Sequence, residues 1–367
     1  MQHLFQGTFK NRKILITGDT GFKGSWLAIW LHEMGAHVFG YALPAKTVND
    51  NFVKADLKSK ITHQVGDISD FDKFLSFVKE TQPEIIFHLA AQPLVLLSYQ
   101  NPRETFQTNL IGTVNFFEAV RAVSSVKVAI NITSDKCYEN QNWVWGYREN
   151  DPMGGKDPYS SSKGCSELIT SSYLHSFFQI EGSAAIASAR AGNVIGGGDW
   201  AEDRIVPDFF RSQSKGEPLS IRNPNHTRPW QHVLEPLSGY LQLASKLFIK
   251  GKEYSGGWNF GPLDSNHYSV EELINRSIAA LGSGSFVVPQ SDAKPHEAHL
   301  LKLDISKAMK FLNWKPALDF QETVTFTVEG YKAELDGFEV YSKRVNQINE
   351  YVTIAAKQNI EWTNSLK

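Results

Sequence analysis

Residues 13–24 read KILITGDTGFKG, and this stretch decides the fold of the chain. Residues 13–17 predict a short buried strand, and residues 25–34 predict a helix with an apolar face. Between them lie Gly18, Gly21 and Gly24. A backbone that approaches a pyrophosphate has no room for β-carbons, and the following helix offers its N-terminal N–H groups to phosphates. The spacing G-x-x-G-x-x-G therefore predicts a dinucleotide-binding turn; a tight connection without a ligand is the alternative.

The alternation of strand and helix continues to about residue 190. Further strands are predicted at 37–41, 61–65, 85–89, 127–133 and 183–189, and further helices at 71–80, about 102–122 and about 163–178. This alternation implies a parallel sheet covered on both faces. The predicted fold class is α/β, a Rossmann-type doubly wound parallel sheet, with ligands beyond the carboxyl ends of its strands.

A second, smaller lobe is expected after residue 190, where the alternation weakens. Three consecutive glycines at 196–198 and prolines at 207, 218, 224 and 229 indicate a loop-rich region. We expect a dinucleotide-binding domain at 1–189, with returning segments near 232–262, and an α/β substrate lobe at 190–231 and 263–367.

Tyr159 and Lys163 form the first candidate catalytic pair. They are four residues apart and share one helix face. A phenol has an ordinary pKa of about 10. A neighbouring ammonium and the positive ring of an oxidised nicotinamide favour the phenolate, which can then accept a hydroxyl proton while hydride leaves the carbon. Alone the pair could be a surface feature, but it follows Ser134, which is placed to bind the same hydroxyl; capping is the alternative role of Ser134.

Asp135 and Lys136 follow Ser134 directly at the end of a predicted strand. Polar residues at such a position usually belong to a site rather than to the core. A simple dehydrogenase has no need of this second acid/base pair, so the two residues suggest oxidation that prepares an elimination. An exposed Asp-Lys turn is the alternative.

The second and third predicted strands bear on the choice of dinucleotide. NAD-binding folds usually carry an acid at the end of the second strand, but residues 39–43 read FGYAL, with no acid and no neighbouring Arg. Because no Arg is present to bind the 2′-phosphate of NADP, NAD is preferred to NADP. Asp67, after the third strand, is placed to bind the adenine amino group or, alternatively, to cap the helix that begins near Ser69.

Composition excludes several other classes of protein. The 367 residues carry a formal net charge of −2 with no basic run, which argues against nucleic acid and anionic membranes as partners. Two cysteines cannot build a disulfide framework, and the polar first ten residues do not resemble a signal peptide. The histidines lack ligand-like spacing. We expect a cytoplasmic protein without a metal site.

Five longer strings carry a family resemblance. They are residues 17–27 (TGDTGFKGSWL), 88–92 (HLAAQ), 133–138 (TSDKCY), 190–200 (RAGNVIGGGDW) and 228–233 (RPWQHV). With Tyr159 and Lys163 they resemble the extended short-chain dehydrogenase/reductase family, in its nucleotide-sugar 4,6-dehydratase branch. Most members of that branch carry Glu where this chain has Lys136; the enzymes acting on CDP-glucose resemble it in using Lys.

The resemblance implies an NAD-dependent lyase that converts CDP-glucose to CDP-4-dehydro-6-deoxy-glucose. Tyr159 would deprotonate the C4 hydroxyl, Asp135 would protonate the departing C6 hydroxyl, and Lys136 would remove the C5 proton. The last two roles need a protonated carboxyl and a neutral amine. Which group acts as the C5 base is left open, because this chain departs from the common pattern at Lys136.

The site residues are predicted on the same grounds. The cofactor is expected to contact Gly18, Thr20, Gly21, Phe22, Lys23, Gly24, Asp67, Ile68, Leu89, Ala90, Ala91, Asn109, Tyr159 and Lys163. The nucleotide sugar is expected to contact Gln92, Asn193, Arg204, Arg222 and Arg228. A guanidinium fork matches phosphate oxygens, although solvated loop charges are the alternative for the three arginines.

Two rival functions remain at this point. A C4 epimerase of the same family would share the glycine turn, Ser134, Tyr159 and Lys163 but would have no use for Asp135 and Lys136. A non-catalytic cofactor sensor need not retain both Tyr159 and Lys163. By resemblance, we also expect a homodimer or homotetramer and a place in deoxysugar synthesis for lipopolysaccharide O-antigen.

Overall fold

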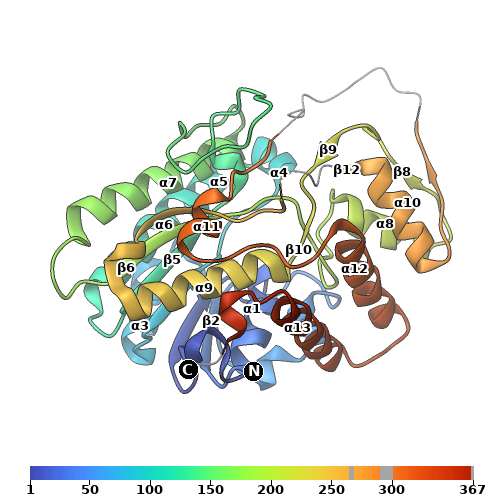
Figure 1. Ribbon diagram of the computed structural model, residues 1–367. Helices are drawn as coiled ribbons and strands as arrows, with labels where there is room; N and C mark the ends of the chain where they lie inside the picture. Colours follow the sequence, from blue (N-terminus) through green and yellow to red (C-terminus); the bar gives the residue numbers. More distant parts are fainter. Residues whose placement is uncertain (264–267, 290–300, 365–367) are drawn as a thin grey trace.

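Seven parallel strands form one sheet in the order β11-β6-β5-β4-β1-β2-β3 (Figure 1). Its strands are β1 (Lys13–Thr17), β2 (His37–Ala42), β3 (Thr62–Val65), β4 (Ile85–His88), β5 (Val128–Ile132), β6 (Ala185–Arg190) and β11 (Gly256–Asn259). The computed structural model describes residues 1–263, 268–289 and 301–364. The predicted doubly wound α/β fold is confirmed.

Helices cover both faces of the sheet, and others form the second lobe. The larger helices of the molecule are α1 (Phe22–Glu33), α3 (Phe71–Thr81), α6 (Gly112–Ala122), α7 (Pro158–Phe177), α8 (Ile205–Ser214), α9 (Leu234–Lys250), α10 (Val270–Leu281), α12 (Phe320–Leu335) and α13 (Val340–Lys357). Shorter ones are α2 (Asn51–Lys54), α4 (Val95–Gln100), α5 (Pro102–Phe106) and α11 (Ser306–Phe311). Helix α1 begins three residues earlier than Ser25, the predicted start, because the backbone turns helical immediately after Gly21.

The helix predicted at about 102–122 is interrupted by a wider turn. Between α5 and α6, residues Gln107–Ile111 form a π-helix. Such turns occur mostly as single insertions in α-helices and are frequent at functional sites. The buried Asn109 lies within this turn.

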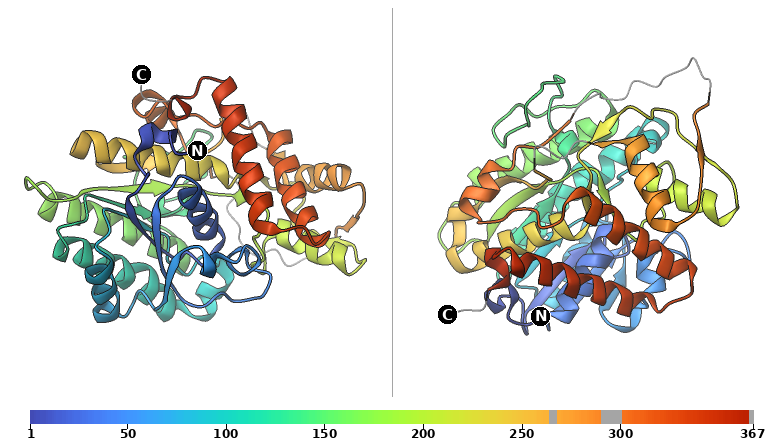
Figure 2. Two further views of the ribbon diagram at one scale, coloured as in Figure 1. Left: turned by 90° about the horizontal axis from the view of Figure 1, so that it is seen from below. Right: turned by 45° about the vertical axis from the view of Figure 1, so that its right-hand side comes forward.

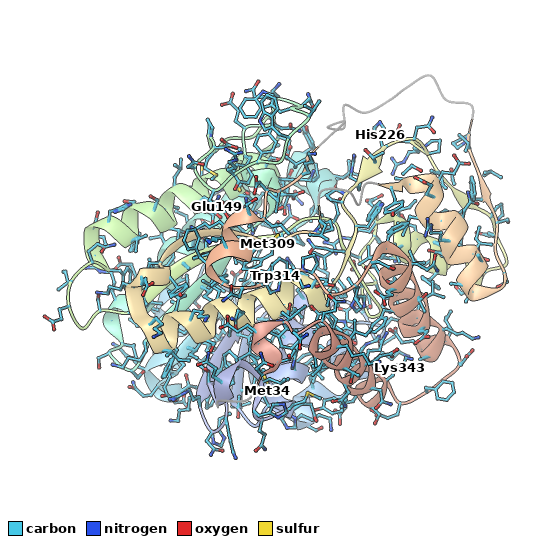
Figure 3. All side chains as sticks on the ribbon, viewed as in Figure 1. Met34, Glu149, His226, Met309, Trp314 and Lys343 are labelled. Carbon is cyan, nitrogen blue, oxygen red and sulfur yellow. The ribbon has the colours of Figure 1, made fainter. Side chains whose placement is uncertain are left out.

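The two faces of the sheet are packed differently. On one face α3, α6 and α7 enclose a core that includes Leu15, Phe74, Phe116 and Ile186. On the other face α1, α9 and α13 enclose a larger core with the tryptophans 26, 30, 314 and 362. Trp314 lies beside α9 and donates its indole N–H to Ser238 Oγ at 2.8 Å (Figure 3).

The second lobe has a core of its own around α8, α10 and α12. Phe210 stacks on Tyr331 at 4.0 Å between ring centroids, and Tyr268 stacks on Phe320 at 3.7 Å. Short strand pairs complete it: β8 (Leu219–Ser220) with β13 (Phe286–Val287), and β9 (Thr227–Arg228) with β12 (Tyr268–Ser269). A further pair, β7 (Val194–Ile195) with β10 (Gln231–His232), connects this lobe to α9.

The chain crosses between the lobes more than once. Helix α9 packs on β5 and β6, and β11 pairs with β6 as the outermost strand of the sheet. The stretch 263–367, expected in the second lobe, is divided: α10 and α12 belong there, whereas α13 packs against α1 (Figure 2). Trp362 then stacks on Phe5 at 5.0 Å, so the two ends of the described chain meet. No described helix has the length and apolar character needed to cross a membrane.

Candidate active site

The glycine turn leaves its backbone bare at the carboxyl end of β1. Gly18 has φ +78°, and a β-carbon there would lie 2.8 Å from the backbone nitrogen of Ala90. A β-carbon on Gly24 would overlap the carbonyl oxygen of Gly18. Both positions therefore require glycine, for conformation at one and for space at the other.

This turn fits the pyrophosphate of a dinucleotide. Helix α1 starts directly after Gly21, and no described side chain caps its N-terminal N–H groups. Uncapped N–H groups and the helix dipole favour a phosphate at this position. Thr20 holds the turn by donating its hydroxyl to the carbonyl oxygen of Leu43 at 2.9 Å.

Behind the turn lies a buried side-chain hydrogen bond that was not predicted. Asp19 is fully buried, and its Oδ2 lies 2.7 Å from Nδ1 of His63 on β3. A β-carbon on Gly40 would overlap the Asp19 carboxylate. Burial raises the pKa of Asp19, and His63 acts in the opposite direction. An unusual Asp inside the glycine motif was the available signal.

Asp67 and Ile68 follow β3 as expected. Ile68 is buried, whereas Asp67 is exposed and its Oδ1 accepts the backbone N–H of Ser69 at 2.8 Å. This hydrogen bond closes a local turn, whereas the helix cap that was the alternative role of Asp67 is supplied by Asp70, whose side chain accepts the N–H of Lys73 at the start of α3. The adenine contact stays a prediction.

Two other predicted contacts are used within the protein. Asn109 Oδ1 accepts the N–H of Gln92 at 2.8 Å, and its amide nitrogen donates to the carbonyl oxygen of Gln92 and to Ser162 Oγ. The Gln92 side chain binds Leu94 and Thr105. Asn109 and Gln92 therefore have a positioning role, because their hydrogen bonds join the loop after Leu89–Ala91 to α7. Most of the polar atoms of these two side chains already have partners within the protein, so few hydrogen-bonding atoms remain for a cofactor or a sugar.

Tyr159, Lys163 and Ser134 lie together at the carboxyl ends of β5 and β6. Tyr159 and Lys163 lie on the buried face of α7, with 7% and 6% of their surface exposed. Burial raises the pKa of Tyr159 to about 12, and its hydrogen bond to Ser134 acts in the opposite direction. Burial lowers the pKa of Lys163 to about 8. The protein alone thus raises the pKa of the Tyr159 phenol above its ordinary value. The lowering of this pKa that the sequence analysis expects is left to the positive charge of the oxidised nicotinamide.

Asp135 is the best-anchored residue of the second acid/base pair. It is 4% exposed, its Oδ1 accepts the Ser134 hydroxyl at 2.8 Å, and its Oδ2 lies 3.5 Å from Asn193 Nδ2. A β-carbon on Gly192 would overlap this carboxylate. Lys136 is half-buried, and its backbone N–H donates to Ser134 Oγ at 3.3 Å. Asp135 and Lys136 therefore begin a short turn (Asp135–Cys137) at the strand end that carries Ser134.

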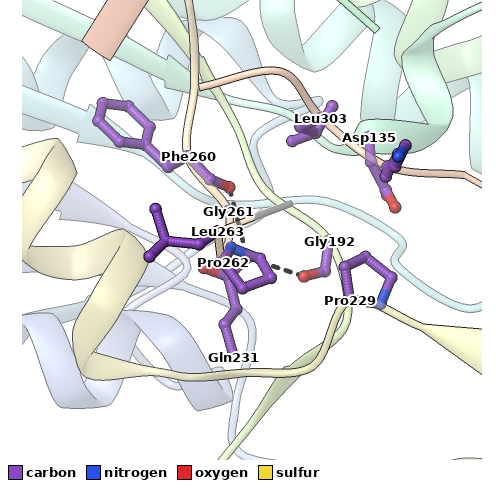
Figure 4. A pocket seen from close by; sticks show the side chains of 10 residues that line it. Asp135, Gly192, Pro229, Gln231, Phe260, Gly261, Pro262, Leu263 and Leu303 are labelled. Carbon is purple, nitrogen blue, oxygen red and sulfur yellow. Dashed lines mark hydrogen bonds between the residues drawn. The ribbon is translucent and has the colours of Figure 1, made fainter. Parts of the chain in front are cut away.

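A small pocket beside Asp135 brings in residues that the predicted list lacks. It is lined by Asp135, Gly192, Pro229, Gln231, Phe260, Gly261, Pro262, Leu263, Lys302 and Leu303 (Figure 4). Gln231 donates to the carbonyl oxygens of Gly192 and Phe260. Gln231 lies within the string 228–233 that carries the family resemblance, so the sequence offered a signal for it. No motif in the sequence pointed to Lys302.

The three predicted arginines differ in their surroundings. Arg204 precedes α8 and forms an ion pair with Asp199 at 2.7 Å, which raises its pKa; Tyr159 adds to this shift, so the guanidinium faces the catalytic end. Arg228 is half-buried on β9 and donates to the carbonyl oxygen of Thr227. Arg222 is exposed. Phosphate binding by these residues stays a prediction.

Lys23 points from α1 toward the same region. Its Nζ lies 3.5 Å from Tyr240 Oη. Burial lowers the pKa of Lys23 to about 7, with Lys163 and Arg204 acting in the same direction and Asp135 against them. Among the described residues, no cluster of three or more His, Cys, Asp or Glu side chains could hold a metal ion.

A glycine turn without side chains, next to a helix that carries the Tyr-Lys pair on a parallel sheet, is the arrangement of a short-chain dehydrogenase/reductase of the extended type. The family model described as GDP-mannose 4,6 dehydratase matches residues 15–327, and the chain belongs to this family of nucleotide-sugar dehydratases.

Two sugar-nucleotide dehydratases are among the known proteins that resemble the chain. It is 48% identical over 353 residues to CDP-glucose 4,6-dehydratase of Salmonella typhimurium, covering 95% of this chain and 98% of the relative. It is 25% identical over 341 residues to dTDP-glucose 4,6-dehydratase of Xanthomonas campestris pv. campestris, covering 86% and 92%.

Solved structures share the fold. A UDP-glucose-4-epimerase from Stenotrophomonas maltophila, with NAD bound, superposes with a TM-score of 0.76 at 19% identity, covering 89% of this chain and 99% of that one. The dTDP-glucose 4,6-dehydratase of Bacillus anthracis, in complex with NAD, gives 0.72 at 19%, covering 90% and 99%.

Proposed function

We propose that this protein catalyses the NAD-dependent dehydration of CDP-glucose to CDP-4-dehydro-6-deoxy-glucose. The observation that carries the reaction type is the contact between Ser134 and the buried Asp135, next to Tyr159. The choice of CDP-glucose is supported by the identity to the Salmonella typhimurium protein of that name. An epimerase shares the alcohol-binding residues but needs no acid at Asp135.

The steps of the reaction are shared among side chains at the carboxyl ends of β5 and β6. The glycine turn would hold NAD, which would supply the hydride acceptor for C4 oxidation and the hydride for C6. Ser134 binds the C4 hydroxyl and Tyr159 takes its proton. Asp135 protonates the departing C6 hydroxyl as water leaves, and Lys136 removes the proton from C5 and returns one to C5 when C6 receives the hydride. A positioned acid or base typically contributes about 10²–10⁴-fold.

One incubation separates this function from its rivals. The protein is mixed with CDP-glucose in deuterated water and the sugar is examined by NMR. We expect a 4-keto-6-deoxy product with deuterium at C5. An inverted C4 alcohol without solvent label would instead identify an epimerase, and unchanged sugar would favour a cofactor-sensing protein. Parallel incubations with dTDP-glucose and UDP-glucose test the choice of base.

Replacing Lys136 tests its role as the C5 base. We expect Lys136→Met to lower dehydration at least about 10²-fold while C4 oxidation continues, so that reduced cofactor accumulates and absorbs near 340 nm. Lys79→Met, at an exposed position on α3, is the control. Dehydration at the rate of the unmodified protein in Lys136→Met would refute the assignment.

The assembly and the cellular setting are further parts of the proposal. By resemblance to similar enzymes, the helices that begin at Pro102 and that contain Lys163 pair with their copies in another subunit. Ile111 and Leu168 are 38% and 59% exposed on these two segments, which supports a homodimer or homotetramer. Leu168→Glu is expected to reduce the mass measured by light scattering. The two free cysteines, Cys137 and Cys165, suit a reducing cytoplasm. There the product would enter deoxysugar synthesis for O-antigen.

A further inference from the structure

Helix α7 is attached to the sheet mainly through polar side chains. Ser162, Ser166, Glu167 and Thr170 are all buried on this helix. On the sheet side, Asn131 of β5 donates to Ser166 Oγ at 3.0 Å and to Thr170 Oγ1 at 2.9 Å. A helix attached by directional hydrogen bonds has one preferred register, whereas apolar packing tolerates small shifts.

We call the buried polar residues Ser162, Ser166, Glu167 and Thr170 of α7, with their hydrogen-bond partners, the polar seam. Glu167 is the charged residue among these four. It lies one helical turn after Lys163 and is 5% exposed. Its Oε1 accepts the Thr133 hydroxyl, and its Oε2 accepts the Ser188 hydroxyl at 2.6 Å and Arg190 Nη2 at 2.8 Å. One carboxylate thus joins α7 to residues at the carboxyl ends of β5 and β6.

Two of these three contacts, those with Thr133 and Arg190, involve residues next to or near the site. Thr133 precedes Ser134, and Arg190 lies two residues before Gly192, which contacts Asp135. Glu167 and Lys163 share one face of α7 because they are four residues apart. Glu167 therefore contacts Thr133 and Arg190, which lie close in sequence to Ser134 and Gly192, and does not itself line the pocket.

Several charged or titratable groups act on the Lys163 amine. Glu167 and Cys137 raise the pKa of Lys163, against the larger effect of burial. Lys23 on α1 interacts with it through like charge, and His88 on β4 is kept neutral partly by it. Arg190 lowers the pKa of Glu167, and so keeps that carboxylate ionised beside the amine.

We propose that Glu167 is a positioning residue for this site. Its carboxylate fixes α7 against β5 and β6, and its negative charge keeps the Lys163 amine protonated where it meets the dinucleotide. The inference concerns the site assigned under the proposed function, but it requires only that NAD binds beside Lys163.

The test is the pH dependence of NAD affinity, measured by quenching of tryptophan fluorescence between pH 6 and pH 10. Hydrogen bonds donated by an ammonium to ligand oxygens are stronger than those donated by a neutral amine. The dissociation constant of NAD is therefore expected to rise as the pH passes about 8. In Glu167→Gln this rise should begin about one pH unit lower, because Glu167 lies on the same helix face as Lys163 and a neighbouring opposite charge shifts a pKa by about 1–3 units.

Two variants separate positioning by charge from simple stability. Glu167→Asp keeps the charge and should retain the pH profile even if its melting temperature falls. Ser188→Ala removes a hydrogen bond to Glu167 without changing any charge, and should also lower the melting temperature while leaving the profile in place. A Glu167→Gln protein with an unchanged profile would overturn the proposal.

A second variant covers the case in which Glu167→Gln does not fold. Arg190→Gln removes the guanidinium that keeps the buried Glu167 carboxylate ionised, so the rise in the dissociation constant should move to lower pH, as in Glu167→Gln. No movement would again contradict the proposal. Because no sugar is present in these titrations, their outcome is independent of whether CDP-glucose proves to be the substrate.

Discussion

Two buried glutamates on opposite faces of the sheet have opposite electrostatic behaviour. Glu167 on α7 is 5% exposed and its pKa is lowered, with Arg190 as the main cause opposing burial. Glu235 on α9 is 1% exposed, and burial raises its pKa to about 7. Its oxygens accept the N–H groups of Ala317 and Leu318 and the hydroxyl of Tyr351, but no guanidinium.

The two faces of the sheet are therefore held by different kinds of contact. On the α7 face, charge-assisted and hydroxyl hydrogen bonds join the helix that carries Tyr159 and Lys163 to β5 and β6. The face covered by α1, α9 and α13 relies on aromatic packing, and α1 is buried over all of residues 24–31. A helix that is buried on all sides is held by apolar contacts with its surroundings.

The largest effect should come from the catalytic end of the polar face. Tyr159→Phe removes the proton acceptor and is expected to lower turnover about 10²–10⁴-fold, with little change in melting temperature. Steady-state assays with CDP-glucose measure this. Tyr173→Phe on the same helix loses only a hydrogen bond to Glu118 and should keep near-full activity. Equal losses in the two variants would remove the functional distinction along α7.

On the apolar face, Trp30→Ala should affect stability instead. Trp30 is fully buried against Phe5, Tyr351 and Trp362. Truncation of a core aromatic of this size costs about 3–5 kcal/mol in the free energy of unfolding, measured by denaturant titration. The folded fraction should keep its turnover rate. Trp145→Ala, at a residue 57% exposed, is the matched control.

The pH dependence of stability should distinguish the two glutamates. A carboxyl whose folded pKa is raised stabilises the protein below its unfolded pKa, and this contribution is lost as the pH rises through the folded pKa. Glu235 therefore weakens stability between about pH 4.5 and 7, by about 3 kcal/mol at most for a shift of this size. Glu235→Gln should remove that fall.

Glu167 should behave with the opposite sign. Its lowered pKa stabilises the protein above pH 4.5, and the contribution is lost as the pH falls through the folded value.

The shift assigned to Glu235 is tested by chemical denaturation of the parent protein and of Glu235→Gln at pH 5 and pH 8. A Glu235→Gln difference that is the same at both values would contradict the assigned shift.

The smallest effect is expected within the polar seam. Ser166→Ala removes one acceptor of Asn131, which keeps Thr170 as a partner. The loss should be about 1 kcal/mol of unfolding free energy, with turnover reduced by less than about tenfold. A loss as large as that of Trp30→Ala would show that the seam carries stability as much as register.

Local patterns account for what could be predicted. The glycine turn has to be bare to let a phosphate approach, and the alternation of strand and helix lies in residue order, so both are readable along the chain. Tyr159 and Lys163 meet because of helical spacing alone. Ser134, Asp135 and Lys136 lie at a strand end that the same alternation locates, although their catalytic roles stay predictions.

The doubly wound sheet, the glycine turn and the helix that carries the Tyr-Lys pair can be read from residue order, because each depends on local periodicity and spacing. Folding in three dimensions was needed to place α13 against α1, Asp19 beside His63, and Gln92 in hydrogen-bond contact with Asn109. These contacts join residues far apart in the chain. Their partners are selected by burial and hydrogen-bond satisfaction in the folded molecule, which no local spacing encodes.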